Sequence, residues 1–274
     1  MRLTMKNKKA LVVISFGSTF DETRKRDIGG IEAALATALP DFDQYRAFTS
    51  GIIRKRLAAR GIFIDDVEAL LPKLATAGYE EVLLAPTHLL HGEEFEQKIL
   101  ALKENFLPLF KSITISRPLI VTEEDYQLAV SALLEQLPPL AEGEGVIFMG
   151  HGTPRANNAA HGYTYVKLQE LFDQCQVPVL VGTVEDEDTP NFATVLERLQ
   201  QRGYKHVHLY PLMVVAGDHA NNDMYGDEPD SWKSQIEALG ISTTGHLNGI
   251  GRYPAIQKLY IQHALQALSS SEKA

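Results

Sequence analysis

The sequence predicts an α/β protein built from two similar halves, each a parallel sheet flanked by helices. Short apolar, β-branched segments alternate with stretches of helical apolar spacing, which is typical of parallel sheets covered on both faces. The order of elements also repeats. GVIFMGHGTP at 145–154 parallels ALVVISFGST at 10–19, and GYKHVHLYPLMVVAGDH at 203–219 parallels GYEEVLLAPTHLLHGEE at 78–94. This self-similarity indicates an internal duplication, in which we expect Ser18 and His151 to occupy corresponding points after the first strand of each half.

Four strands and four helices are predicted for the first half. The strands are short apolar runs, at 9–17, 44–48, 81–86 and 112–117. The helices show apolar spacing of three to four residues, at 22–39, 52–59, 67–77 and 95–107. Pro40 ends the first helix, and Gly78 is a suitable residue to follow the third.

The second half begins with a helix from about Thr122 that ends before Pro138-Pro139. Its strands are expected from 145, at 177–181 and at 207–215. The halves are therefore expected to meet near residue 125, giving an N-terminal half, 1–125, and a C-terminal half, 126–274. The last helix is a candidate to pack back on the first half.

Composition excludes several classes of protein. The chain has 274 residues, of which 45% are hydrophobic, and no apolar run approaches the ~18 residues of a membrane span. Its formal charge of −9 disfavours binding to nucleic acid or anionic lipid. A single cysteine cannot form an internal disulfide, and the first residues, MRLTMK, lack a signal-type apolar run. These features favour a cytoplasmic protein.

Three polar residues follow consecutive strands of the second half. His151 lies between two glycines after the first strand, Glu185 follows the second and His219 follows the third. Parallel strands place such residues at one edge of the sheet, where ligands bind. Two imidazoles and one carboxylate bind a divalent transition ion and leave coordination positions open.

Each of these three residues also has a purely structural interpretation. His151 can cap the helix that follows it. Glu185 can belong to a solvated acidic loop, because three more acidic residues follow it directly. His219 can be part of a cluster of Asx turns at 217–223.

The corresponding loop of the first half contains His88, His91, Glu93 and Glu94. It can form a second metal site, an acidic proton relay or a polar cap for the next helix, and Glu94 is expected to face the ligand. The remaining histidines are expected to be structural or exposed, namely His161, His206, His208, His246 and His263. No phosphate loop, dinucleotide fingerprint or serine elbow is present, so no organic cofactor is implied.

These loops resemble those of the anaerobic cobaltochelatase family of cobalamin biosynthesis, which belongs to the class II chelatases. The resemblance is collinear from about Lys9 to Ala267 and rests on the segments ALVVISFGSTF, QYRAFTSGIIRK, THLLHGEEFE, FMGHGTP, VGTVE, PLMVVAGDHANNDM and DSWK. It implies two flavodoxin-like halves with a tetrapyrrole cleft between them.

The resemblance also implies roles for individual residues. The metal ligands match His151, Glu185 and His219, the proton acceptor matches His151, and the first-half acid near the metal path matches Glu94. His91 stands where some relatives have asparagine. The segment against the macrocycle matches the loop of Phe16, Gly17, Ser18 and Thr19. Basic residues such as Arg54 or Arg155 are candidates to hold the acidic substituents of the macrocycle.

The activity implied is insertion of Co²⁺, as a substrate ion, into sirohydrochlorin or its reduced precursor precorrin-2, with release of two protons. Insertion of iron into the same tetrapyrrole is the nearest alternative, because two histidines and a glutamate accept either ion. A non-catalytic metal-binding protein and a haem-binding or carrier protein are alternatives of another class. The sequence leaves the oligomeric state open.

Overall fold

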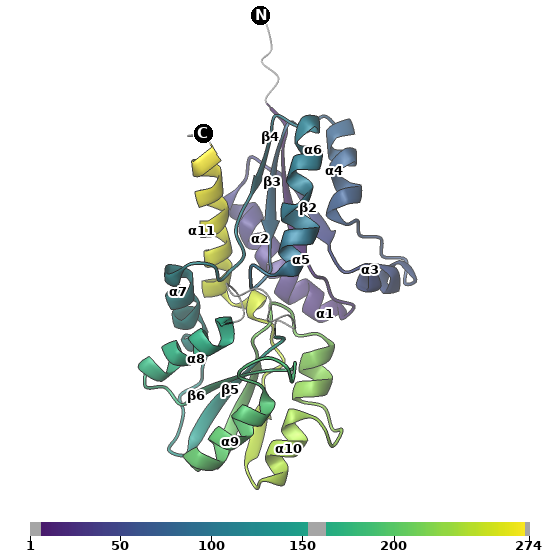
Figure 1. Cartoon of the computed structure of the whole chain (residues 1–274). Coiled ribbons are helices and arrows are strands. Elements are labelled where there is room, and N and C mark those ends of the chain that lie inside the picture. The colour runs from purple at the N-terminus through teal and green to yellow at the C-terminus, as the bar shows by residue number, and fades with distance from the viewer. Residues whose placement is uncertain (1–6, 153–162, 272–274) are drawn as a thin grey trace, which may run out of the picture. The chain divides into compact units, whose positions relative to one another are not determined.

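The computed structural model describes residues 7–152 and 163–271, which form two compact units (Figure 1). Unit 1 comprises Met1–Val121 together with Ile256–Ala274, and unit 2 is Thr122–Ala255. The chain therefore enters unit 2 once and then returns to unit 1.

Unit 1 is built on a four-stranded parallel sheet. Its strands are β1 (Lys9–Ser15), β2 (Asp43–Phe48), β3 (Glu81–Pro86) and β4 (Ser112–Ile115), in the order β2-β1-β3-β4. The central strand β1, KALVVIS, is buried at every residue after the first. This matches the continuous apolar run expected of a parallel strand with both faces covered.

The helical segments of unit 1 connect its strands, except α11, which follows unit 2 in the chain. They are α1 (Asp21–Thr23), the π-helical η1 (Arg24–Ile28), α2 (Gly29–Ala38), α3 (Gly51–Ala58), α4 (Val67–Thr76), α5 (Glu93–Phe95), the π-helical η2 (Glu96–Leu100), α6 (Leu102–Phe106), the 3₁₀ turn η3 (Leu107–Leu109) and α11 (Pro254–Ser271). Ser50 and Asp66 begin α3 and α4 by accepting hydrogen bonds from the backbone N–H of Ile53 and Ala69.

Unit 2 repeats the same sheet. Its strands are β5 (Glu144–Gly150), β6 (Val179–Thr183), β7 (His206–Pro211) and β8 (Ser242–Gly245), in the order β6-β5-β7-β8. Its helical segments are α7 (Glu123–Leu134), α8 (Thr164–Gln174), α9 (Phe192–Arg202), the π-helical η4 (His219–Met224), α10 (Trp232–Ala238) and the 3₁₀ turn η5 (Ile250–Arg252). The two parallel sheets confirm the predicted fold class.

Some element boundaries differ from the predictions. The strand expected at 207–215 ends at Pro211, although Leu212 and Val214 are still buried. Burial continues past the last ladder hydrogen bonds, so an apolar run alone overestimates the strand. The helices expected at 22–39 and 95–107 each contain a π-helical segment, η1 or η2. Among the described residues, no helix is both long enough and apolar enough to cross a membrane.

Candidate metal centre

His151 is positioned by the end of β5 and by the two glycines beside it. A Cβ on Gly150 would lie 2.2 Å from Cε1 of the buried Tyr165 ring, so only glycine fits there. Gly152 has a φ of +103°, a conformation that L side chains rarely adopt. Its backbone N–H donates to the Tyr165 hydroxyl at 3.4 Å. The tight turn leaves the His151 imidazole about half exposed.

Glu185 lies in the loop after β6, against the loop that carries His151. The backbone N–H of Glu185 donates to the carbonyl of His151 at 3.3 Å, and the N–H of Asp188 donates back to the carbonyl of Glu185 at 3.1 Å. A Cβ on Gly152 would come within 3.0 Å of the Glu185 Cβ and Cγ atoms. Glycine at position 152 therefore lets the two loops approach each other closely.

His219 is the first residue of the π-helical segment η4. Ala220 and Met224 anchor this segment, since both are fully buried in the apolar core of unit 2. Nδ1 of His219 lies 2.5 Å from a carboxylate oxygen of Asp223. π-helical turns are rare in proteins as a whole, and those that occur often lie at functional sites.

The structure brings the three predicted ligands of unit 2 together. Nδ1 of His151 lies 4.0 Å from a carboxylate oxygen of Glu185. The rings of His151 and His219 meet edge to face with their centroids 4.9 Å apart. All three side chains are between 38% and 47% exposed, so an ion can reach them from solvent.

The three side chains are neighbours, but their donor atoms are not yet close enough together to bind one ion. Within residues 7–152 and 163–271, no group of three or more His, Cys, Asp or Glu side chains is already arranged to hold an ion. Donor atoms bound to one transition ion lie about 3 Å apart, given metal–nitrogen distances of about 2.0–2.1 Å. The distance between Nδ1 of His151 and the carboxylate oxygen of Glu185 is about 1 Å longer than that. Ligation therefore requires small rotations of exposed side chains.

In unit 1, the loop after β1 combines an exposed aromatic ring with a fixed backbone. Phe16 is 54% exposed, and Gly17 has a φ of +103° like Gly152. Ser18 is buried, and its hydroxyl accepts from the N–H of Phe20. The guanidinium of Arg24 donates to the Ser18 carbonyl at 3.1 Å. That of Arg60 donates to the Thr19 carbonyl at 2.6 Å.

The loop after β3 carries the other first-half candidates. Glu94 is half-buried in the single turn α5, immediately before η2. Nε2 of His91 lies 3.2 Å from a carboxylate oxygen of Glu96, and its ring meets that of Phe95 edge to face. Both ring nitrogens of His88 are buried and have no hydrogen-bond partner among the described residues. Burial lowers the pKa of His88 to about 4.

The duplication can be aligned through the structure. Gly17 and Gly152 share the same φ, so Phe16, and not Ser18 as expected, is the counterpart of His151. Segments 10–19 and 145–154, aligned without a gap, also pair Phe16 with His151 and Gly17 with Gly152. Glu94 corresponds to His219. The π-helical segment η2 begins shortly after Glu94, and η4 begins at His219. The polar edge of each sheet is thus built alike, with imidazoles in unit 2 replaced by Phe16 and Glu94 in unit 1.

Other sequence candidates have structural partners. Arg54 pairs with Asp66 at 2.6 Å. His206 contacts Ser242 and Thr244, and Nδ1 of His208 lies 3.1 Å from Nε2 of His246. His263 is buried. Arg155 and His161 lie outside the described residues.

The structure identifies two residues that support the proposed ligands. Asp223 contacts His219 through a helical turn, and Tyr165 packs beneath the glycine turn of His151. The dense run of polar residues at 217–223 was the available signal for Asp223. None existed for Tyr165, whose role depends on the tertiary fold.

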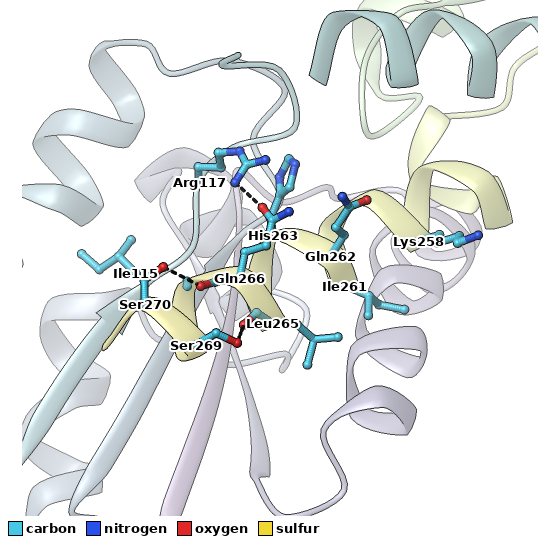
Figure 2. Close-up of a pocket in the computed structure, with 11 residues that line it drawn as sticks. Ile115, Arg117, Lys258, Ile261, Gln262, His263, Leu265, Gln266, Ser269 and Ser270 are labelled. Atoms are coloured by element: carbon cyan, nitrogen blue, oxygen red, sulfur yellow. Dashed lines mark hydrogen bonds between the residues drawn. The ribbon is translucent and has the colours of Figure 1, made fainter. Parts of the chain in front are cut away.

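A separate groove of about 870 Å³ lies in unit 1 between β4 and α11 (Figure 2). Arg117, at its rim, donates to the side-chain oxygen of Gln266 at 2.6 Å. Lys258 is the other cation of its lining. None of the predicted site residues lines this groove.

Comparison with known structures defines the class of the fold. SirB from Bacillus subtilis, solved with Fe³⁺, matches with a TM-score of 0.63 at 15% identity, covering 97% of this chain and 98% of that one. The fold is therefore that of a class II chelatase. The model of the cobalt chelatase (CbiK) family matches residues 9–269, and the chain belongs to that family.

Two curated relatives support the same family. The sirohydrochlorin cobaltochelatase of Salmonella typhimurium is 41% identical over 263 residues, which cover 96% of this chain and 97% of the relative. The sirohydrochlorin cobaltochelatase CbiKC of Nitratidesulfovibrio vulgaris is 31% identical over 267 residues, covering 96% and 92%. The resemblance drawn from the sequence is thus confirmed, as is the expectation of a metal chelatase.

Proposed function

We propose that this chain inserts Co²⁺ into sirohydrochlorin in cobalamin biosynthesis, with the ion as a substrate. Family membership and the names of its relatives support this activity. The observation that carries the mechanism is the meeting of His151, Glu185 and His219 at the carboxyl edge of one sheet. Parallel sheets bind ligands at this edge.

The three side chains suit an ion that must be released again. Two neutral imidazoles and one carboxylate hold a divalent transition ion while leaving positions for water or pyrrole nitrogen. The charge of Glu185 offsets part of the charge of the ion. Since few protein ligands hold the ion, exchange to the four nitrogens of the macrocycle costs few bonds.

His151 has two successive roles in this proposal. It first binds the ion through a ring nitrogen. When the ion passes to the macrocycle, that lone pair becomes free and accepts one of the two pyrrole protons. The second proton leaves to water, and His151 afterwards releases its own proton to water. A neutral imidazole carries a lone pair on one ring nitrogen, and histidine is the side chain that most often acts as a general base.

Residues of unit 1 are proposed to contact the macrocycle. Phe16 offers an exposed aromatic face, on a loop that Arg24 and Arg60 hold through its carbonyls. Aromatic rings stack on flat conjugated ligands. Gly17, Ser18 and Thr19 complete the loop, and Glu94 is proposed as a helper in proton or metal transfer.

The preference for cobalt over iron is tested by competition. Purified enzyme is given sirohydrochlorin with Co²⁺, with Fe²⁺, or with both at equal concentration, and the product is identified by its absorption spectrum. We expect cobalt-sirohydrochlorin to form in the first and third mixtures. If no cobalt product forms, the proposed ion is wrong. Parallel reactions with precorrin-2 identify the reduction level of the tetrapyrrole.

The same assay separates catalysis from simple binding. A metal- or haem-binding protein would bind its ligand without changing the spectrum of the free tetrapyrrole. We expect many product molecules per protein molecule. If the product does not exceed one molecule per protein molecule, the chain is not a catalyst.

We further propose that the protein is located in the cytoplasm, which cell fractionation tests.

A further inference from the structure

The π-helical segment η4 holds an acidic residue beside a proposed metal ligand. Asp223 lies four residues after His219, and helical residues at this spacing project from the same face. Its carboxylate oxygen lies 2.5 Å from Nδ1 of the imidazole, a short distance for a nitrogen–oxygen hydrogen bond. Nε2 of His219 does not take part in this contact.

The backbone around this pair is fixed from two sides. Ala220 and Met224 are fully buried and hold η4 against the core of unit 2. The side-chain amide of Asn221 donates to the carbonyl of Gly217 at 2.7 Å, which ties the segment to its entry loop. His219 and Asp223 are the partly exposed members, at 40% and 46%. Their contact therefore orients one exposed ring on an anchored scaffold.

The chemistry of the contact selects one tautomer. An ionised carboxylate only accepts hydrogen bonds, so Nδ1 of a neutral His219 must carry the proton. The lone pair then resides on Nε2, on the opposite side of the ring. Histidines that ligate metals commonly donate their other N–H to a carboxylate, which fixes the tautomer and raises the basicity of the ligating nitrogen.

We propose that Asp223 is a positioning residue of the metal centre, which holds His219 with Nδ1 protonated and presents the Nε2 lone pair to Co²⁺. The inference rests on the proposed ligation of the ion by His219. In this role Asp223 acts through His219.

The test compares the wild-type enzyme with the variants Asp223→Ala, Asp223→Asn and His219→Ala. Asp230→Ala is the matched control, because Asp230 is an exposed acid seven residues away whose loss changes the net charge equally. Two quantities are measured at pH 8, where imidazoles are neutral. They are the Co²⁺ dissociation constant by calorimetric titration and the tautomer of His219 by ¹⁵N NMR of the metal-free protein.

We expect Asp223→Ala to weaken Co²⁺ binding about 10- to 100-fold, as for other partners of ligating histidines. We also expect it to move the proton of His219 from Nδ1 to Nε2. Asp230→Ala should leave both quantities unchanged. Asp223→Asn keeps the size of the side chain and should weaken binding in the same direction, which separates charge from packing.

Two results would overturn the inference in distinguishable ways. If His219→Ala weakens binding but Asp223→Ala does not, or if the tautomer is unchanged in Asp223→Ala, Asp223 does not position the ligand although the metal site stands. If His219→Ala itself leaves Co²⁺ binding unchanged, the proposed ligand set and the role of Asp223 fail together.

Discussion

Glycines determine how closely the loops of the proposed metal centre can approach their neighbours. Gly152 brings the loop of His151 against Glu185, and an added Cβ would meet the Glu185 side chain at 3.0 Å. Gly17 plays the matching part in unit 1, where a Cβ would lie 2.6 Å from the Phe48 ring. The glycines on both sides of His151 therefore form the turn and also leave room for the side chains of Tyr165 and Glu185.

The variant Gly152→Ala is expected to weaken Co²⁺ binding about tenfold, at the lower end of the cost of displacing a ligand's support. The added methyl group pushes Glu185 away from His151. Gly203→Ala is the control, because Gly203 also has a positive φ of 67° but no atom lies within 4 Å of an added Cβ. Both variants should lose about 1 kcal/mol of stability from backbone strain. Equal Co²⁺ affinities in calorimetric titrations of the two variants would contradict this account.

The three proposed ligands of unit 2 could be picked out from the sequence because each follows a recognisable strand. The sequence could not predict their partners. Asp223 reaches His219 through a π-helical turn, whose single extra residue leaves the apolar pattern almost unchanged. The sequence offers no signal for the contact between His246 and His208, which the register of β7 with β8 brings side by side. Contacts between strands depend on register, which one strand's sequence does not contain.

At the scale of elements, the loop after β3 contains a buried imidazole. His88 follows the end of β3, and both of its ring nitrogens are buried without a hydrogen-bond partner among the described residues. Burial disfavours the charged imidazolium and lowers the pKa of His88 from 6.5 to about 4. The loop is therefore sensitive to acid even though no carboxylate pairs with this histidine in the described chain.

The stability of the protein should fall as the pH decreases from 6.5 towards 4. In this range the unfolded chain protonates His88 and the folded chain does not, so acid favours unfolding. Between pH 7 and pH 5 the loss due to His88 is about 2 kcal/mol. Urea unfolding at both pH values should show this extra loss in wild type relative to His88→Gln. A loss as large in the variant as in wild type would show that His88 titrates normally.

At the scale of the molecule, the two units have the same strand order, as expected from the duplicated segments. The strand ends and π-helical segments could not be located from the sequence, because Leu212 and Val214 continue the buried pattern beyond β7. After unit 2 the chain returns to unit 1 through α11, whose Tyr260 hydroxyl donates to the carbonyl of Thr87 at 2.9 Å. The C-terminal helix α11 is therefore part of unit 1 and is hydrogen-bonded to the loop after β3.

Removing this buried hydrogen bond should destabilise unit 1. We expect Tyr260→Phe to lower the free energy of unfolding by about 1–2 kcal/mol, since the carbonyl of Thr87 loses a donor. Tyr163→Phe is the control, because Tyr163 is 69% exposed. Chemical denaturation followed by circular dichroism measures both. Identical unfolding midpoints for the two variants would show that α11 contributes nothing through this contact.

In the proposed mechanism, His151 binds the substrate ion and accepts a proton during its insertion. The most direct measurement is the rate of cobalt-sirohydrochlorin formation by His151→Ala beside that of the wild-type enzyme, with folding checked by circular dichroism. Its half-exposed side chain makes loss of the fold unexpected. We predict a folded variant without measurable insertion. A folded variant that inserts Co²⁺ at a near-normal rate would contradict the account.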